Sequence, residues 1–177
     1  MDKRLKLENS IRSIPDFPKP GILFRDITTL IQDKKAFKSS LKAIAEKFKD
    51  KKIDLVVGVE ARGFIFGGAL ADKLGAGFVP VRKKGKLPWK TRSVSYELEY
   101  GTDTLEMHED AIKAGARILI IDDLLATGGT VAAVVELVKQ FQGKIVGIAF
   151  VIELVDLKGR EKLKGYPIVS LVKFKGL

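Results

Sequence analysis

The fold is decided by residues 118–130, which read Ile-Leu-Ile-Ile-Asp-Asp-Leu-Leu-Ala-Thr-Gly-Gly-Thr. The first four residues are apolar and three of them are β-branched, which is typical of a strand buried on both faces. Two carboxylates, Asp122 and Asp123, follow at once, and then a glycine-containing turn. Valines recur at helical spacing from Val131 onwards, so we expect a helix to begin near Thr130.

This order of elements suits a particular kind of ligand. Gly128 and Gly129 allow backbone N–H groups to converge, and a helix start adds unpaired N–H groups and a positive dipole end, so a phosphate fits there. Asp122 and Asp123 would repel a phosphate, but carboxylates accept hydrogen bonds from hydroxyls. The stretch therefore predicts a phosphorylated sugar, with its phosphate on the loop and its diol on the acids. The alternative is that the aspartates merely end a strand and the glycines merely turn the chain.

Composition limits the class of protein. The chain has 177 residues, of which 46% are hydrophobic and 31% charged, and this suits one globular domain. It has no cysteine, which excludes disulfides and thiolate chemistry. No apolar run approaches the roughly 18 residues that span a membrane, and the N-terminus lacks the apolar core of a signal peptide, so we expect a cytoplasmic protein. The net charge of +10 favours anionic partners, either nucleic acid or phosphorylated small molecules, although lysine-rich solvated surfaces explain it equally well.

The remaining chain alternates helices and strands. Apolar spacing predicts an amphipathic helix over residues 3–13, followed by a proline-rich segment that forms either a surface loop or a wall over a flat ligand. Asp33 is a good N-cap for a helix of about 15 residues. Buried strands are expected at 53–59, 78–82, 145–152 and 168–172, with helices between them. The pattern predicts an α/β fold with a mainly parallel twisted sheet flanked by helices.

Three further regions carry polar residues of interest. Arg62 follows the strand at 53–59, at the position where ligands bind in open α/β sheets. The alternative is that Arg62 only pairs with Glu60 or a surface acid. Residues 83–92 form a long basic loop that is either solvated surface or a lid over a polyphosphate. Alternation over residues 94–107 predicts a β-hairpin. We expect His108, the only histidine of the chain, to lie at the surface.

The acidic pair with the Ala-Thr-Gly-Gly-Thr loop resembles the ribose-phosphate-binding signature of the type I phosphoribosyltransferases. Four more blocks are similar to the adenine phosphoribosyltransferase family and stand in its order: Phe17–Ile27, Glu60–Phe64, Val79–Pro88 and Tyr96–Asp103. The resemblance implies a single domain over residues 1–177, with an N-terminal arm and base-binding hood at about 1–30 and a flexible lid loop and hairpin at about 83–107. It also implies that adenine and phosphoribosyl pyrophosphate react to give AMP and pyrophosphate, with Mg²⁺ held mainly by substrate oxygens and no metal ligand set in the protein.

The resemblance also implies roles for individual residues. Asp122 and Asp123 would hold the ribose hydroxyls. Glu99 would be the catalytic glutamate near N7 of the base. Arg62 and Lys86 would contact pyrophosphate, and Arg82 would reach the pyrophosphate site of the partner subunit in a homodimer. The 5′-phosphate would be bound by Ala126, Thr127, Gly128, Gly129 and Thr130. Adenine would be read by the backbone of Leu23 and Arg25 and packed between Phe24 and Leu124.

Three alternatives stand beside this reading on the sequence alone. The ribose-phosphate signature does not separate adenine from guanine, hypoxanthine or xanthine. A non-catalytic regulator could use the same fold to sense phosphoribosyl pyrophosphate while binding DNA, but we expect such a protein to carry an extra DNA-reading domain, whereas the expected fold begins almost at residue 1. The third is a nucleic-acid-binding module that uses the basic surface, but no motif of such a module is recognisable, so we expect neither nucleic-acid nor membrane partners.

Overall fold

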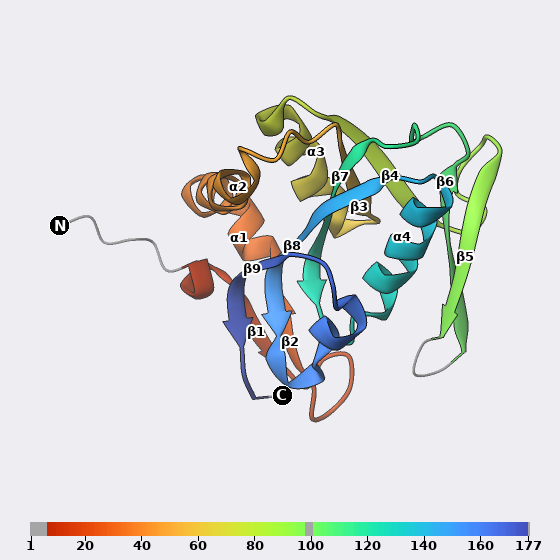
Figure 1. The fold of residues 1–177 in the computed structure, drawn as a ribbon. Helices are drawn as coiled ribbons and strands as arrows, with labels where there is room; N and C mark the ends of the chain where they lie inside the picture. Colours follow the sequence, from red (N-terminus) through yellow and green to blue (C-terminus); the bar gives the residue numbers. More distant parts are fainter. Residues whose placement is uncertain (1–6, 98–100, 177) are drawn as a thin grey trace.

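A twisted sheet forms the centre of the computed structural model, which describes residues 7–97 and 101–176 (Figure 1). Its strands are β3 (Leu55–Val59), β4 (Gly77–Lys83), β5 (Thr91–Glu97), β6 (Thr102–His108), β7 (Arg117–Leu125), β8 (Lys144–Leu154) and β9 (Ile168–Phe174). They lie in the order β5-β6-β4-β3-β7-β8-β9. The neighbouring strands β4, β3, β7, β8 and β9 are parallel to one another. The antiparallel hairpin β5–β6 joins the sheet at β4, where β6 pairs with β4 in the antiparallel direction. The predicted α/β fold with a mainly parallel sheet is confirmed.

Helices cover both faces of this sheet. The α-helices are α1 (Thr28–Gln32), α2 (Lys34–Phe48), α3 (Arg62–Leu74) and α4 (Gly129–Gln140), and the short 3₁₀ helices are η1 (Leu7–Ser10), η2 (Val155–Leu157) and η3 (Gly159–Leu163). Helices α1, α2 and α3 pack on one face, and α4 and η3 pack on the other. The Asp33 side chain caps α2 by accepting hydrogen bonds from the N–H groups of Lys35 and Ala36, at 2.8 and 2.9 Å, as the sequence predicts.

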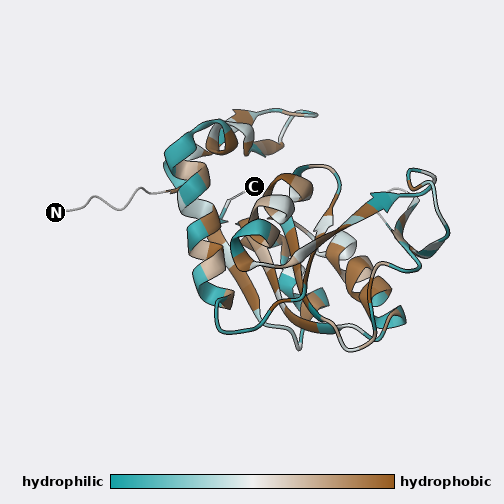
Figure 2. Ribbon diagram, turned by 90° about the horizontal axis from the view of Figure 1, so that it is seen from above, coloured by the Kyte–Doolittle hydropathy of each residue, from teal (hydrophilic) through white to brown (hydrophobic). Residues whose placement is uncertain are grey.

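The central strand β7 shows why its apolar run is unbroken. Ile118 and Ile120 point towards α4, whereas Leu119 and Ile121 point towards α2 and α3. All four side chains are fully buried, because successive residues of a strand face opposite sides of a sheet that is covered on both. Hydrophobic residues accordingly concentrate along the strands in the interior, and hydrophilic residues on the outer turns and loops (Figure 2).

A second, two-stranded antiparallel sheet contains β1 (Arg12–Pro15) and β2 (Leu23–Asp26). The predicted helix over residues 3–13 is therefore wrong where the structure describes it, because only η1 is helical and β1 is extended. Pro15 disfavours a helical conformation at the residue before it. Arg12 also forms an ion pair with Asp26 of β2 at 2.7 Å, which fixes the extended pairing.

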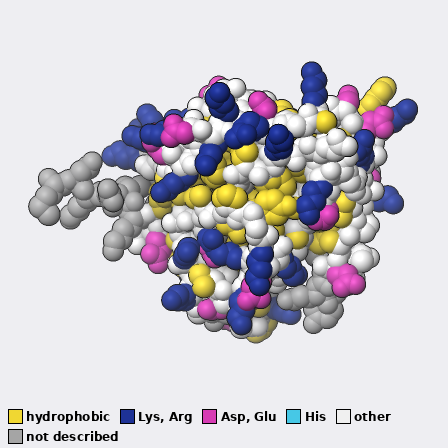
Figure 3. Space-filling view, viewed as in Figure 1, with side chains coloured by type: hydrophobic (Ala, Val, Ile, Leu, Met, Phe, Trp, Pro, Cys, Tyr) yellow, Lys and Arg dark blue, Asp and Glu magenta, His cyan; other side chains and the backbone are white. Residues whose placement is uncertain are grey.

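The described chain bears on two expectations from the sequence, the one about a membrane span and the one about the exposure of His108. Lys and Arg side chains are scattered among acidic ones on the face in Figure 3, around a band of hydrophobic side chains. None of the helices in the described ranges is both long enough and apolar enough to cross a membrane. The expectation of a surface His108 is wrong, because this residue is half-buried and its Nε2 atom is buried with no hydrogen-bond partner among the described residues.

Candidate active site

The loop between β7 and α4 has the shape that the sequence predicts. Gly128 adopts φ of 79°, a left-handed conformation that favours glycine, and α4 begins at the next residue. No side chain caps this helix. Within the described chain, the backbone N–H groups from Thr127 to Thr130 have no hydrogen-bond acceptor. The loop therefore presents several unpaired donors and a helix N-terminus to one space, which suits an anion.

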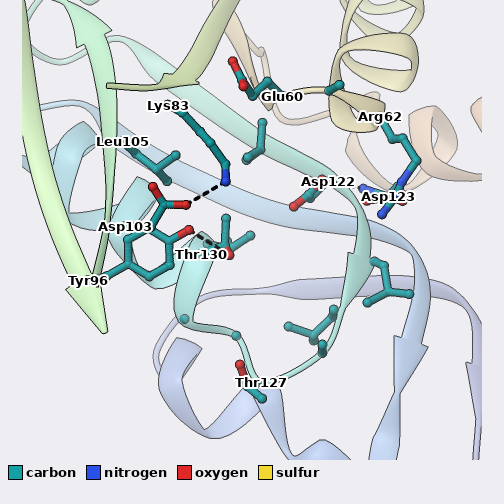
Figure 4. Close-up of a pocket in the computed structure, with 18 residues that line it drawn as sticks. Glu60, Arg62, Lys83, Tyr96, Asp103, Leu105, Asp122, Asp123, Thr127 and Thr130 are labelled. Carbon is teal, nitrogen blue, oxygen red and sulfur yellow. Dashed lines mark hydrogen bonds and ion pairs between the residues drawn. The ribbon is translucent and has the colours of Figure 1, made fainter. Parts of the chain in front are cut away.

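Two carboxylates lie beside this loop, near the end of β7. Asp123 is buried and accepts a hydrogen bond from Nε of Arg62, the first residue of α3. Asp122 accepts a hydrogen bond from the N–H of Asp123 at 2.8 Å. Burial, and secondarily the charge of Asp123, raises the pKa of the Asp122 carboxyl well above its usual value. Figure 4 shows Asp122 directed into the pocket and Asp123 directed towards Arg62.

Helix α3 comes close to this acidic pair because its second residue has no side chain. A Cβ atom on Gly63 would lie 3.0 Å from Oδ1 of Asp122 and 3.2 Å from the carbonyl oxygen of Ile121. The close approach brings Arg62, at the start of α3, to the carboxyl end of β7. The sequence left open a pairing of Arg62 with Glu60 or a surface acid, but the structure pairs it with the buried Asp123.

Glu60, which follows β3, forms ion pairs with two more cations. Its carboxylate accepts a hydrogen bond from Nε of Arg82 at 2.8 Å and another from Nζ of Lys86. Burial raises the pKa of Glu60, but the hydrogen bonds from Lys86 and Arg82 outweigh it, and the net effect is a pKa below the usual value. The peptide bond that joins Glu60 to Ala61 is cis. All three cations that were predicted to contact pyrophosphate are thus paired with carboxylates.

These features surround one cavity of about 610 Å³ (Figure 4). It is lined by Val59, Glu60, Ala61, Arg62, Lys83, Tyr96, Asp103, Leu105 and residues 122–131. It therefore brings together all of the predicted ribose-phosphate residues, which are Asp122, Asp123 and residues 126–130, and also Leu124, which was predicted to pack on adenine. Two of the predicted cations, Arg82 and Lys86, are not among its lining residues.

The comparisons with known proteins identify the family. Residues 28–174 match the phosphoribosyl transferase domain. The chain belongs to this family. A relative from Clostridium kluyveri, named adenine phosphoribosyltransferase, is 61% identical over 170 residues, which are 96% of this chain and 99% of that protein.

Solved structures of the phosphoribosyl transferase family agree with the fold. Adenine phosphoribosyltransferase from Thermoanaerobacter pseudethanolicus superposes with a TM-score of 0.91 at 55% identity, over 95% of this chain and 98% of that one. The Saccharomyces cerevisiae enzyme, solved with an imino-altritol bisphosphate and adenine, gives a TM-score of 0.89 at 44% identity, over 93% and 96%.

Three of the four predicted base-binding residues lie on the small sheet, whereas the fourth, Leu124, lies on β7 and lines the cavity. Leu23, Phe24 and Arg25 belong to β2, and none of them lines the cavity. The Phe24 ring packs edge-on against Phe17, with centroids 5.1 Å apart. The Arg25 guanidinium lies over the ring of Phe174, 3.9 Å from its centroid, so β2 sits beside the carboxyl end of β9. The structure thus places the predicted hood at the same edge of the sheet as the phosphate loop, without joining it to the cavity.

Besides Glu60, three polar residues of the cavity were not predicted as site residues from the sequence: Lys83, Tyr96 and Asp103. Lys83 forms an ion pair with Asp103 at 2.9 Å, and Tyr96 lies with its hydroxyl 3.5 Å from Oγ1 of Thr130. Tyr96 and Asp103 come from the hairpin β5–β6, and strand alternation could have placed Tyr96 on the face that its neighbour Val94 buries. The predicted catalytic residue, Glu99, lies outside the described residues.

Proposed function

We propose that this protein transfers the 5-phosphoribosyl group of phosphoribosyl pyrophosphate to N9 of adenine, giving AMP and pyrophosphate in purine salvage. One observation carries the proposal: four consecutive N–H groups, from Thr127 to Thr130, which have no acceptor among residues 7–97 and 101–176, lie beside the carboxylates of Asp122 and Asp123 in a single cavity. Relatives 61% identical to this chain are named adenine phosphoribosyltransferase, which supports adenine as the base.

The loop and the acidic pair divide the substrate between them. The 5′-phosphate accepts hydrogen bonds from the loop amides and interacts favourably with the N-terminus of α4. The ribose hydroxyls donate hydrogen bonds to Asp122 and Asp123. Because the two groups sit at opposite ends of the ribose phosphate, both contacts together fix the position of C1′.

The reaction breaks the bond between C1′ and a pyrophosphate oxygen and forms the bond between C1′ and N9. Positive charge develops on the ribose ring while negative charge grows on the leaving pyrophosphate. Arg62 and Lys86, together with the Arg82 side chain from a second copy of the chain, supply cations for the leaving group, and fixed cations stabilise such charge without reorganisation of solvent. On arrival, pyrophosphate would replace Asp123 as the partner of Arg62, and Glu60 as the partner of Lys86. No protein nucleophile is needed.

The base would be held by the hood. We propose that the backbone of Leu23 and Arg25 reads the adenine edge, that Phe24 and Leu124 pack on its faces, and that Glu99 exchanges a proton with the base near N7. General acid–base catalysis of this kind contributes about 10²–10⁴-fold. We also propose that residues 1–30 act as arm and hood and residues 83–107 as a lid that excludes water.

Magnesium fits this site as a companion of the substrate. The acidic pair offers hard oxygen donors, but the described part of the chain contains no cluster of three or more potential metal ligands. Mg²⁺ keeps waters and prefers phosphate and carboxylate oxygens, so substrate oxygens would hold most of its coordination sphere. When bound, the ion would neutralise charge on pyrophosphate. Asp122 and Asp123 would orient the hydroxyls that share it.

A homodimer follows from the proposed role of Arg82, which would reach the pyrophosphate site of a second copy. Within one chain this side chain already bonds Glu60 and the carbonyl oxygen of Lys86, at 2.8 and 3.0 Å, so reaching across would require it to exchange partners. Sedimentation of the purified chain should give twice the mass of 19.5 kDa. We further propose a cytoplasmic location, because the phosphorylated substrates do not cross membranes freely.

The decisive experiment compares four bases. Purified protein with Mg²⁺ and phosphoribosyl pyrophosphate is incubated separately with adenine, guanine, hypoxanthine and xanthine, and nucleotide products are quantified. We expect AMP from adenine and little product from the other bases. Equal turnover of guanine would refute the adenine assignment and favour a different purine phosphoribosyltransferase. Retention of DNA at physiological salt without any turnover would favour the regulator.

A further inference from the structure

The phosphate loop is in direct backbone contact with a segment that lies far from it in the sequence. A Cβ atom on Gly159 would lie 2.2 Å from the carbonyl oxygen of Ala126 and 3.0 Å from the amide nitrogen of Gly128. Conversely, a Cβ atom on Gly128 would lie 2.4 Å from the carbonyl oxygen of Gly159. These distances are shorter than real Cβ contacts, so the two backbones meet where no side chain fits.

Gly159 is held in this position by its neighbour in η3. The Arg160 guanidinium donates two hydrogen bonds to the Glu153 carboxylate, from Nε at 2.6 Å and from Nη2 at 2.7 Å. Glu153 lies on β8, is only 4% exposed, and stands in register with Leu125, at the end of β7. Arg160 also donates to Oγ of Ser170 on β9 at 3.2 Å. Hydrogen bonding with Arg160 keeps the pKa of Glu153 below its usual value, so the pair stays charged.

The other end of η3 is anchored in the core. Leu163 is 1% exposed and packs in the hydrophobic cluster that contains Val131 and Val134 of α4. The segment that begins at Gly159 is thus fixed near its start by the two-pronged ion pair of Arg160 and at its end by the buried Leu163. A segment fixed at both ends has little freedom to move away from the loop that it touches.

The loop itself has few internal restraints. The N–H groups from Thr127 to Thr130 have no acceptor within the described chain, so hydrogen bonds of those groups do not hold their direction. The loop backbone instead packs closely against Gly159, and this packing restrains the N–H groups. We infer that Gly159, held by the Arg160–Glu153 pair, is a positioning residue that keeps these amides aimed at the 5′-phosphate. The inference rests on the proposed function, which makes this loop the phosphate site.

Gly159→Ala tests the inference. The added methyl group must push the loop away from Gly159, and displacements of about 1 Å at a positioned site cost up to about 100-fold. We expect the dissociation constant of ribose 5-phosphate, measured by calorimetry on the full chain, to rise about tenfold or more. The KM for phosphoribosyl pyrophosphate should rise in parallel, whereas the KM for adenine and the kcat at saturation should change less than about threefold.

Gly147→Ala is the matched control. Its Cβ atom would lie 2.3 Å from Cε1 of Phe48, an overlap comparable to that at Gly159 but in the core between α2 and β8. This variant should lower the melting temperature without changing the dissociation constant of ribose 5-phosphate. Equal loss of affinity in both variants would overturn the inference, because destabilisation alone would then explain it.

Arg160→Lys covers the case in which Gly159→Ala does not fold. Lysine keeps the charge but cannot bond both carboxylate oxygens in a fork, so we expect a threefold to tenfold rise in the KM for phosphoribosyl pyrophosphate with an unchanged KM for adenine. A lower melting temperature with both KM values unchanged would overturn the inference. If the wild-type chain binds neither ribose 5-phosphate nor phosphoribosyl pyrophosphate, the proposed function itself fails. If the wild type binds and the folded Gly159→Ala variant binds equally well, only the role of Gly159 fails.

Discussion

Asp123→Asn separates the proposed ribose-binding role of the acidic pair from its structural role. The Asp123 carboxylate is 6% exposed, and its one recorded side-chain partner among the described residues is Arg62. Asparagine has nearly the same shape but no charge, and its amide nitrogen is a donor where the carboxylate had an acceptor. The substitution should therefore leave the cavity intact while it weakens the hydrogen bonds that the ribose hydroxyls would donate to this side chain.

The effect of the substitution on substrate affinity and its effect on folding stability have different expected magnitudes. A hydrogen bond to a charged group contributes about 1.5–3 kcal/mol, and about 1.4 kcal/mol corresponds to a tenfold change, so affinity for phosphoribosyl pyrophosphate should fall about 10- to 150-fold. The lost ion pair should cost less, because the Arg62 side chain is 48% exposed and solvent screens it. We expect a loss of at most about 1 kcal/mol, which lowers the melting temperature by less than about 4 °C in a chain of this length.

Steady-state kinetics and thermal unfolding test this prediction together. The KM for phosphoribosyl pyrophosphate should rise while the KM for adenine stays near its wild-type value. Asp72→Asn, the same substitution at an exposed position of α3, serves as the matched control and should change neither quantity. The reasoning is refuted if Asp123→Asn binds phosphoribosyl pyrophosphate within twofold of the wild type, or if the melting temperature falls by more than about 10 °C.

Three further variants test the acidic pair, the base and the fold. The folded-state pKa of Asp122 is raised, so the native state binds more protons than the unfolded state between the two pKa values, and stability falls as pH rises through that window. Asp122→Asn should therefore melt above the wild type at about pH 8, and this advantage should disappear as the pH is lowered to about 4; an equal advantage at both values would contradict the pKa direction. Glu99→Leu should lower kcat at least about tenfold with circular dichroism unchanged, and an unaltered kcat would remove Glu99 from the mechanism. Asp33→Ala removes the N-cap of α2 and should cost about 1 kcal/mol, seen as a loss of about 2–4 °C in melting temperature, with kcat unaffected.

Local signals in the sequence predicted much of the fold correctly. The run from Ile118 to Ile121 indicated a strand buried on both faces because neighbouring residues face opposite layers. Asp33 marked the start of a helix because a side-chain cap is a local requirement, and the structure has this cap. Such features depend on a few adjacent residues, so one sequence suffices to find them.

Long-range pairing explains the failures. Leu7, Ile11 and Ile14 have helical spacing, but Ile14 lies opposite Phe24 in a β-ladder that the spacing alone does not reveal. His108 was expected at the surface because no partner was visible nearby in the sequence. The structure half-buries it at the end of β6, which the order of strands in the sheet determines.

The candidate site likewise combines residues that a local sequence signal reveals with residues that only long-range pairing brings together. The acidic pair and the loop are contiguous, so their order alone indicated a ribose-phosphate site. Lys83, Asp103 and Gly159 come to this site only through the sheet topology, because β4, β6 and the segment after β8 meet around the end of β7. Motif reasoning therefore finds residues that touch a ligand in one stretch and misses residues that arrive from other stretches.

The ion pairs between these cations and carboxylates also bear on how the substrate would bind in the proposed mechanism. Arg62 is bonded to Asp123, and Arg82 and Lys86 are bonded to Glu60. A cation that already has a carboxylate partner lies in a defined place, so less side-chain entropy would be lost if an anion replaced that partner. In the proposed mechanism, the exchange at Arg62 would also free Asp123 to accept hydrogen bonds from the ribose hydroxyls. On this proposal, binding of pyrophosphate by Arg62 and binding of the ribose by Asp123 would favour each other.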